Sequence, residues 1–123
     1  MADDTRLIHV VDDDEAIRQS IAFMLRTAGF RVEAYASGTV FLKAIDRLTK
    51  GCVVLDVRMP DIDGLEVQAR LAVMGSSLPV IILTGHGDVT LAVRAVKAGA
   101  IEFLEKPFER SALLRAIEEA LGD

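Results

Sequence analysis

The sequence predicts an α/β protein in which five parallel strands form a doubly wound sheet, a (βα)5 arrangement. Three observations lead to this prediction. Short apolar runs alternate with longer amphipathic stretches five times along the 123 residues, which is typical of a parallel sheet with helices on both faces. The first, third and fourth runs are almost continuously apolar, as in strands that are buried on both faces. The second and fifth runs contain charges, as edge strands do.

The strands are expected from their apolar and β-branched residues. The first reads LIHVV and the third reads CVVL, whereas glutamates interrupt the second and the fifth. The expected strands span residues 7–11, 32–35, 52–55, 79–83 and 101–104. With the second and fifth strands at the edges, the strand order becomes 2-1-3-4-5, which is the flavodoxin-like order.

Each strand is followed by a stretch with apolar residues at helical spacing. The expected helices span residues 15–28, 38–48, 64–74, 89–98 and 111–121. In the second helix, Phe41, Ile45 and Leu48 are expected to face the core. Asp88 is expected to cap the start of the fourth helix, and glycines follow the first and fourth helices where C-terminal caps belong.

The composition excludes several classes of protein. Hydrophobic residues make up 51% of the chain, too many for a disordered protein, and no apolar run approaches the roughly 18–20 residues of a membrane span. The net charge of −5 argues against a broad basic face that binds nucleic acid. The single cysteine, Cys52, excludes an internal disulfide and a multi-thiolate zinc site. The first residues, MADDTR, lack the basic and apolar regions of a signal peptide, so we expect a cytoplasmic protein without a membrane partner.

Polar residues follow four of the five strands. Asp12 and Asp13 follow the first strand, Asp56 the third, Thr84 the fourth and Lys106 the fifth. The carboxyl ends of these strands meet at one edge of the sheet, where ligands bind in such folds. Three clustered carboxylates repel one another, and a hard cation such as Mg²⁺ balances them. The lysine and the threonine suit a transferred phosphoryl group, so the set indicates phosphoryl transfer onto an aspartate.

Together, these residues resemble the receiver domains of bacterial two-component response regulators. The resemblance covers essentially the whole chain, residues 1–123, as a single receiver domain with no output domain in this chain. It rests on the acidic pair after the first strand, LDVRMPD at 55–61, the threonine after the fourth strand and KPF at 106–108. The stretches TGHGDV and VKAGA look most like the nitrogen-fixation regulators of that family.

The resemblance implies a role for each residue of the cluster. Asp56 accepts a phosphoryl group from a sensor histidine kinase, and Lys106 pairs with the phosphate. The implied cofactor is Mg²⁺, with Mn²⁺ as an alternative. Asp13 and Asp56 bind it, Asp12 binds it largely through water, and the backbone carbonyl of Arg58 completes the protein ligands.

The resemblance also implies a conformational switch. Thr84 moves toward the phosphate, and Phe103 is the aromatic residue that turns inward when it does. Arg58 and His86, beside the site, tune the lifetime of the acyl phosphate. The peptide bond before Pro107 is expected to be cis, because an X–Pro bond costs only about 0.5–1 kcal/mol in that form and the turn aims the preceding lysine over the site.

Phosphorylation is expected to change the surface of the fourth helix and fifth strand. The residues expected on this face are Leu91, Val93, Arg94, Lys97 and Glu102. Their mixture of apolar and opposite charges suits a reversible, self-complementary homodimer contact. The expected outcome is control of dimerisation or of an output domain, in transcription regulation.

Two other functions are alternatives. A flavodoxin-like cofactor binder needs small or hydroxyl residues after the first strand to hold a phosphate, whereas the residues there, DDDE, repel one. A Mg²⁺-dependent phosphohydrolase that works through an aspartyl phosphate needs a second acid two residues after the nucleophile, where this chain has Arg58. We therefore expect a phosphoacceptor rather than an enzyme, although it assists its own phosphoryl transfer and slow dephosphorylation.

Overall fold

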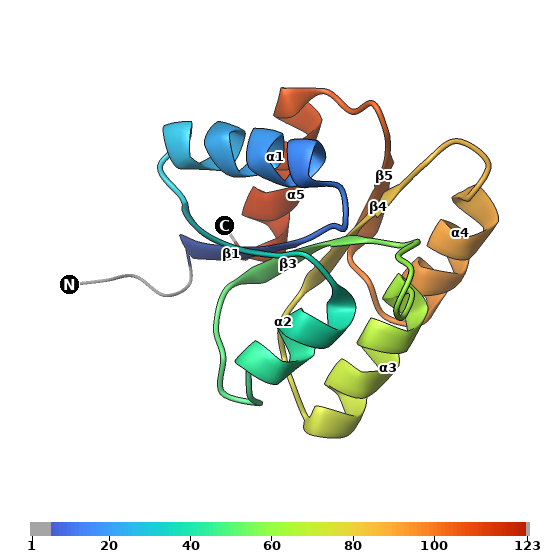
Figure 1. Ribbon diagram of the computed structural model, residues 1–123. Coiled ribbons are helices and arrows are strands. Elements are labelled where there is room, and N and C mark those ends of the chain that lie inside the picture. Colours follow the sequence, from blue (N-terminus) through green and yellow to red (C-terminus); the bar gives the residue numbers. More distant parts are fainter. Residues whose placement is uncertain (1–5, 123) are drawn as a thin grey trace.

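The computed structural model, shown in Figure 1, describes residues 6–122. Residues 1–5, which hold most of the segment compared with a signal peptide, lie outside the described residues, as does residue 123. Five parallel strands form one sheet in the order β2-β1-β3-β4-β5, as predicted. The strands are β1 (Leu7–Val11), β2 (Arg31–Tyr35), β3 (Cys52–Asp56), β4 (Val80–Thr84) and β5 (Glu102–Glu105). The helices are α1 (Glu15–Thr27), α2 (Gly38–Ala44), α3 (Gly64–Met74), α4 (Val89–Lys97) and α5 (Arg110–Ala120).

Helices cover both faces of the sheet. Helices α1 and α5 lie on one side, and α2, α3 and α4 lie on the other (Figure 1). Successive side chains of a strand point to opposite faces, and β3 follows this rule. Cys52 and Val54 pack toward α1 and α5, while Val53 and Leu55 pack toward the other three helices. Because both faces are covered, β3 and β4 are buried along their whole length, which explains their uninterrupted apolar sequences.

Helix α2 is shorter than predicted, and the inward position expected for Leu48 is wrong. The helix ends at Ala44, and the backbone of Ile45 is already extended, with φ −123° and ψ 167°. Asp46 ends the helix by forming a local turn, in which its Oδ1 accepts a hydrogen bond of 2.8 Å from the backbone N–H of Leu48. The Leu48 side chain is left 64% exposed. The other predicted boundaries agree with the structure to within one residue.

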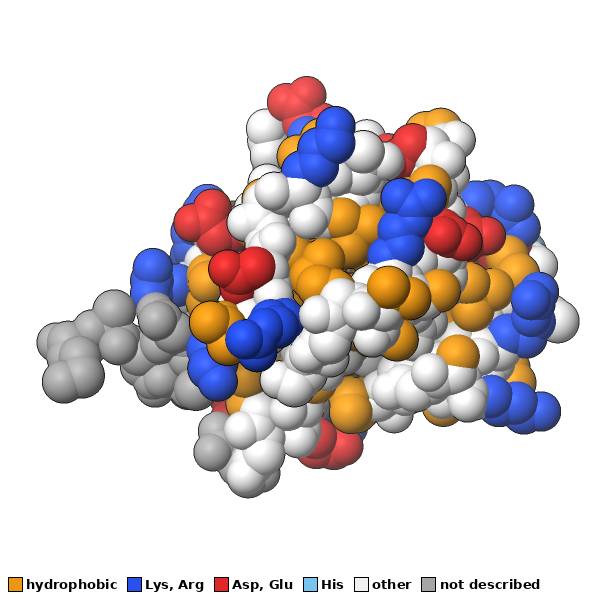
Figure 2. All heavy atoms as spheres, turned by 90° about the horizontal axis from the view of Figure 1, so that it is seen from below, with side chains coloured by type: hydrophobic (Ala, Val, Ile, Leu, Met, Phe, Trp, Pro, Cys, Tyr) orange, Lys and Arg blue, Asp and Glu red, His pale blue; other side chains and the backbone are white. Residues whose placement is uncertain are grey.

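The side of the molecule on which α2 and α3 lie is not uniformly polar. Val40, Leu48 and Val73 are exposed there, and Figure 2 shows hydrophobic surface interspersed with charged side chains on this side. No helix within residues 6–122 is long and apolar enough to cross a membrane.

His9 links β1 to its neighbours inside the sheet. Its Nδ1 lies 3.0 Å from the hydroxyl of Tyr35, and its Nε2 lies 3.1 Å from the backbone oxygen of Lys50. Burial lowers the pKa of the imidazole. Both ring nitrogens are therefore used in structural hydrogen bonds, at a position that precedes the end of the strand.

Candidate functional site

The three predicted carboxylates converge at the carboxyl edge of the sheet. Asp56 is the last residue of β3, and Asp12 and Asp13 follow β1, which pairs directly with β3. Carboxylate oxygens of Asp12, Asp13 and Asp56 all lie within 4.8 Å of one another. Asp12 is fully buried and Asp56 is 7% exposed, whereas Asp13 faces solvent. The cluster is therefore open on one side and enclosed on the other.

Lys106 lies between the two buried carboxylates. Its Nζ donates a hydrogen bond of 3.0 Å to Oδ2 of Asp12 and lies 3.7 Å from Oδ2 of Asp56. The other oxygen of Asp12 accepts a hydrogen bond of 2.9 Å from the backbone N–H of Asp14. Asp12 is thus held by two donors, and Lys106 has a weaker contact with Asp56, whose charge is less well balanced.

The pKa of the Asp56 carboxyl lies closer to neutral pH than that of an ordinary aspartate. Burial, and the negative charge of Asp12, raise the pKa of its carboxyl from 3.8 to about 6, while Lys106 and the backbone N–H of Arg58 act in the opposite direction. The group is still mainly ionised at pH 7, so it retains the negative charge that a nucleophile needs. Its poor solvation favours any ligand that brings positive charge to the site.

The donor set fits a hard divalent cation. Carboxylate oxygens from three residues are the ligands that Mg²⁺ accepts, together with water and phosphate oxygens. The backbone of Arg58 adjoins them, because its N–H donates to Oδ1 of Asp56 at 3.4 Å. A cation at this point would offset the repulsion among Asp12, Asp13 and Asp56.

Thr84 and Lys106 reach the same edge from the next two strands. Thr84 ends β4 and is fully buried, and its Oγ1 donates to the backbone oxygen of Gly85 at 3.3 Å. Its own backbone oxygen accepts a hydrogen bond of 2.8 Å from the N–H of Lys106. The bond between Lys106 and Pro107 is cis, in agreement with the sequence-based expectation.

Phe103 lies on β5 beside a surface hollow, which we call the α4–β5 hollow. The ring is half-buried and packs against the core beneath α4. The hollow has a volume of about 390 Å³ and is lined by Val93, Val96, Lys97, Ile101, Glu102 and Phe103. It contains three of the five residues predicted for a dimer contact. Leu91, another of the five, is half-buried and packs against the core, so only part of its side chain faces outward.

Arg58 and His86 each contact an acidic residue outside the carboxylate cluster. The guanidinium of Arg58 binds the carboxylate of Asp88, with Nη2 2.9 Å from Oδ1 and Nε 3.2 Å from Oδ2. His86 is exposed, and its Nδ1 lies 3.9 Å from a carboxylate oxygen of Glu105. Asp88 occupies the predicted N-cap position, but among the described residues its side chain makes no hydrogen bond to α4. The only hint of this partner in the sequence is that Arg58, in the loop after β3, carries a charge opposite to that of Asp88.

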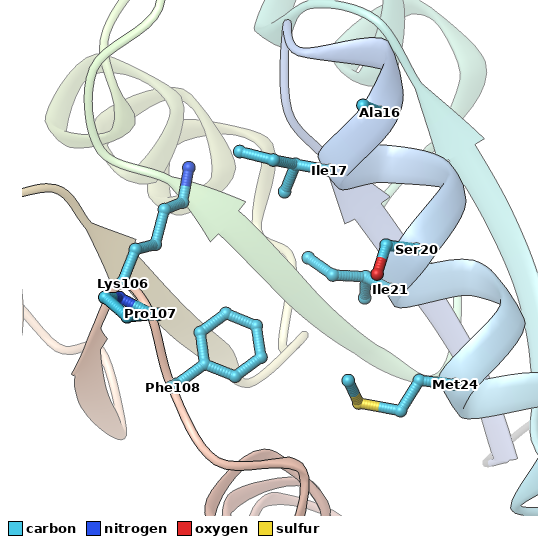
Figure 3. Close-up of a pocket in the computed structure, with 8 residues that line it drawn as sticks. All are labelled: Ala16, Ile17, Ser20, Ile21, Met24, Lys106, Pro107 and Phe108. Atoms are coloured by element: carbon cyan, nitrogen blue, oxygen red, sulfur yellow. The ribbon is translucent and has the colours of Figure 1, made fainter.

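A second hollow, the α1 hollow, has Lys106 of the cluster in its lining. It has a volume of about 470 Å³ and lies between α1 and the segment that follows β5. Its lining is mostly apolar and consists of Ala16, Ile17, Ser20, Ile21, Met24, Lys106, Pro107 and Phe108. Figure 3 shows the ring of Phe108 turned toward Ile21 and Met24, with the Lys106 side chain extending up to the level of Ile17.

Comparisons with known proteins agree with this geometry. A family model described as the response regulator receiver domain matches residues 8–118. The transcriptional regulatory protein FixJ of Azorhizobium caulinodans is 50% identical over 115 residues, which are 94% of this chain and 54% of that protein. The response regulator protein TmoT of Ectopseudomonas mendocina is 46% identical over 121 residues, which are 98% of this chain and 55% of that protein.

Solved structures show the same relationship. The crystal structure of FixJ-N matches with a TM-score of 0.90 at 45% identity, covering 98% of this chain and 95% of that one. A full-length FixJ structure from B. japonicum matches with a TM-score of 0.89 at 50% identity, covering 94% of this chain and 57% of that one. The chain spans about half the length of the curated relatives that it matches.

Proposed function

We propose, because the chain belongs to the family of response regulator receiver domains, that it is a phosphorylation-activated switch whose phosphoacceptor is Asp56. The observation that carries the proposal is the placement of this residue. Asp56 is buried at the end of the central strand β3, within 4.8 Å of two further carboxylates and 3.7 Å from the Lys106 ammonium. We propose that residues 1–123 form one receiver domain and that a sensor histidine kinase is the phosphodonor.

In the proposed reaction, a carboxylate oxygen of Asp56 attacks the phosphorus of a phosphohistidine. The new O–P bond forms as the N–P bond breaks, and the electron pair of that bond leaves with the imidazole nitrogen. Lys106 lies close enough to pair with an oxygen of the transferred group, and the backbone N–H of Arg58 is already directed at Asp56. Burial keeps bulk water away from the carboxylate, which strengthens these interactions.

A divalent cation completes the proposal. Asp12, Asp13 and Asp56, with the backbone carbonyl of Arg58, would hold Mg²⁺ or Mn²⁺ there. When bound, the cation neutralises the charge that builds up as a phosphoryl group approaches three carboxylates.

The conformational response would begin at Thr84. Among the described residues, its hydroxyl bonds only to the backbone oxygen of the next residue, at a long 3.3 Å, so a phosphoryl oxygen offers a stronger, charge-assisted partner. Movement of Thr84 would vacate space beside Phe103. This residue of β5 pairs in register with Ile82, which lies on β4 two residues before Thr84. The ring sits in the wall of the α4–β5 hollow, so its movement would alter that surface.

The proposed reader of this surface is a second copy of the chain. The α4–β5 hollow has an apolar lining with one lysine and one glutamate at its rim, Lys97 and Glu102. Under two-fold symmetry, each charge can meet its opposite on the partner. Where the chain is part of a protein as long as its relatives, dimerisation would control an output region in transcription regulation.

The α1 hollow suits the phosphodonor. A kinase segment that carries phosphohistidine must approach Asp56 closely, and the mostly apolar hollow shown in Figure 3 includes Lys106 of the cluster in its lining. Contact there would position the donor while leaving the carboxylates free. The alternative of a phosphohydrolase gains no support, because Arg58, two residues after Asp56, turns its side chain to Asp88.

The test is phosphorylation of the chain by acetyl phosphate with Mg²⁺, followed by intact-mass spectrometry. We expect the native chain to gain one phosphoryl group and Asp56→Asn to gain none. Asp46→Asn is the matched control, because Asp46 is an exposed aspartate in the turn after α2. A chelator should prevent the mass gain. An undiminished gain in Asp56→Asn would refute the assignment, and turnover of many equivalents of donor would favour the phosphohydrolase.

A further inference from the structure

An ion pair joins the loop after β3 to the loop after β4. The guanidinium of Arg58 binds Asp88 with Nε–Oδ1 and Nη2–Oδ1 distances of 3.1 and 2.9 Å, and Nε also contacts Oδ2 at 3.2 Å. The Asp88 side chain is only 21% exposed, while that of Arg58 is 66% exposed. Both carboxylate oxygens are engaged, so the pair is more closely defined than an ordinary surface contact. It connects the residue two positions after Asp56 to the start of α4.

Asp88 is the residue that would otherwise cap α4. Within residues 6–122, three other helices begin with a side chain that accepts a hydrogen bond from the helix backbone. Asp14 accepts from Ile17 N at 3.2 Å, and Asp63 accepts from Glu66 N at 2.9 Å. Ser37 does the same for α2. Asp88 has a residue type that caps well, but within residues 6–122 its carboxylate makes no bond to the α4 backbone and is held by Arg58 instead.

The backbone around Asp88 can change conformation. Its φ of −110° and ψ of 16° lie outside the extended region that Asp14 and Asp63 occupy as caps. Gly85 and Gly87 precede it, and Gly87 has a φ of +93°. In the described part of the chain, no atom lies within 4 Å of the place where a Cβ on Gly87 would be. The loop therefore has both the glycines and the space that a rearrangement requires.

We propose that the Arg58–Asp88 pair is a latch that a phosphoryl group on Asp56 opens, and that the released Asp88 then caps α4. The proposal rests on the proposed function, since it takes Asp56 as the phosphoacceptor. Arg58 is tethered two residues from the new dianion, which competes with Asp88 for the guanidinium. Asp88 is thus a positioning residue that acts through Arg58, and it passes the change at β3 to the first turn of α4.

The latch has a reciprocal consequence. If occupancy of Asp56 opens the pair, then opening the pair by mutation must favour occupancy by the same factor. Couplings between sites in one protein are typically about 5–150-fold. We therefore expect Asp88→Asn, which keeps a capping side chain but loses the ion pair, to bind the phosphoryl mimic beryllofluoride at least about fivefold more tightly in the presence of Mg²⁺.

The direct test is hydrogen exchange of the Leu91 amide, the third of α4, by NMR on the 123-residue chain. In the native chain we expect this amide to exchange at least about fivefold more slowly after phosphorylation, while the Arg58 Nε–H signal shifts because its partner changes from Asp88 to the phosphoryl group. Arg58→Gln releases Asp88 without any phosphoryl group, so its Leu91 amide should already exchange slowly. Asp88→Ala has neither latch nor cap and should show no slowing on phosphorylation.

Glu66→Gln is the matched control, because it breaks another exposed ion pair, Arg70 Nε to Glu66 Oε2 at 2.9 Å, on α3. It should behave like the native chain. Leu91 exchange in unmodified Arg58→Gln that equals the native rate would overturn the latch. An Arg58 Nε–H signal that stays unchanged in chain shown by mass spectrometry to be phosphorylated would also overturn it. Absence of any mass gain refutes the proposed function instead, and the exchange of unmodified Arg58→Gln still decides the latch.

Discussion

Replacing Asp56 by asparagine should stabilise the metal-free protein at neutral pH. Burial and the charge of Asp12 raise the pKa of this carboxyl from 3.8 to about 6. Ionising it in the folded chain is therefore harder than in the unfolded chain. At about 1.4 kcal/mol for each pKa unit, the difference destabilises the folded state by about 3 kcal/mol once the group is fully ionised in both states.

The sign and the pH range follow from proton linkage. Between pH 4 and pH 6 the folded state binds more protons at Asp56 than the unfolded state does, so stability falls as pH rises through this range. Below pH 4 the carboxyl is protonated in both states and resembles an amide in size. The stability difference between Asp56→Asn and the native chain should thus be small near pH 4 and reach about 3 kcal/mol at pH 7.

Urea denaturation in the presence of a chelator measures this difference at each pH. His9 complicates either curve alone, because burial lowers its pKa and its contribution to stability is lost as pH falls below its ordinary value of 6.5. Since both proteins contain His9, subtraction of the two curves removes its contribution. A difference that stays constant from pH 4 to pH 7 would refute the reasoning. Added Mg²⁺ should stabilise the native chain more than the variant.

Three further predictions concern the site, the backbone and the dimer surface. Lys106→Met should slow phosphorylation of Asp56 by acetyl phosphate on the order of 100-fold, because a preorganised cation near the transferred group is lost; an unchanged rate by mass spectrometry would contradict the proposed role. Gly51→Ala should lower the free energy of unfolding by more than about 2 kcal/mol, because Gly51 has a φ of +114° and its Cβ would lie 2.1 Å from a backbone oxygen. Gly75→Ala, with a φ of +82° and no described atom within 4 Å, should cost about 1 kcal/mol, and equal losses in urea denaturation would count against the steric explanation. Lys97→Glu should weaken dimerisation of the phosphorylated chain in sedimentation experiments while its mass gain stays complete; a dimer constant equal to the native one would remove Lys97 from the contact.

The sequence was informative about the candidate site because topology alone brings strand ends together. Asp12, Asp56, Thr84 and Lys106 each follow an apolar run, and a parallel sheet places all such ends on one edge. No side-chain geometry was needed to predict that they meet. The sequence could not predict that Lys106 lies nearer to Asp12 than to Asp56, at 3.0 against 3.7 Å, because that preference depends on how two buried carboxylates are solvated.

Two departures from local sequence tendencies share a physical cause. Leu48 continues a helical pattern in the sequence, but the turn formed by Asp46 ends α2 first. Asp88 occupies the predicted N-cap position, but within residues 6–122 its carboxylate is bound by Arg58, thirty positions earlier, and not by the helix backbone. In both cases a specific polar contact overrode a local tendency. Such contacts depend on the positions of single side chains, which periodicity does not report.

The charge on Asp56 makes the folded, unliganded protein less stable than it would be with a neutral residue at this position. Asp56 is buried next to Asp12, while the ammonium of Lys106 is engaged chiefly by Asp12, so the charge on Asp56 is under-compensated. A protein selected for stability alone would have an amide at this position, which explains why Asp56→Asn is expected to gain stability. The same deficit of positive charge gives a bound cation a free-energy advantage that a well-balanced site would lack. The stability lost in the unliganded protein is therefore recovered on ligand binding, and that difference between the two states is what a switch requires.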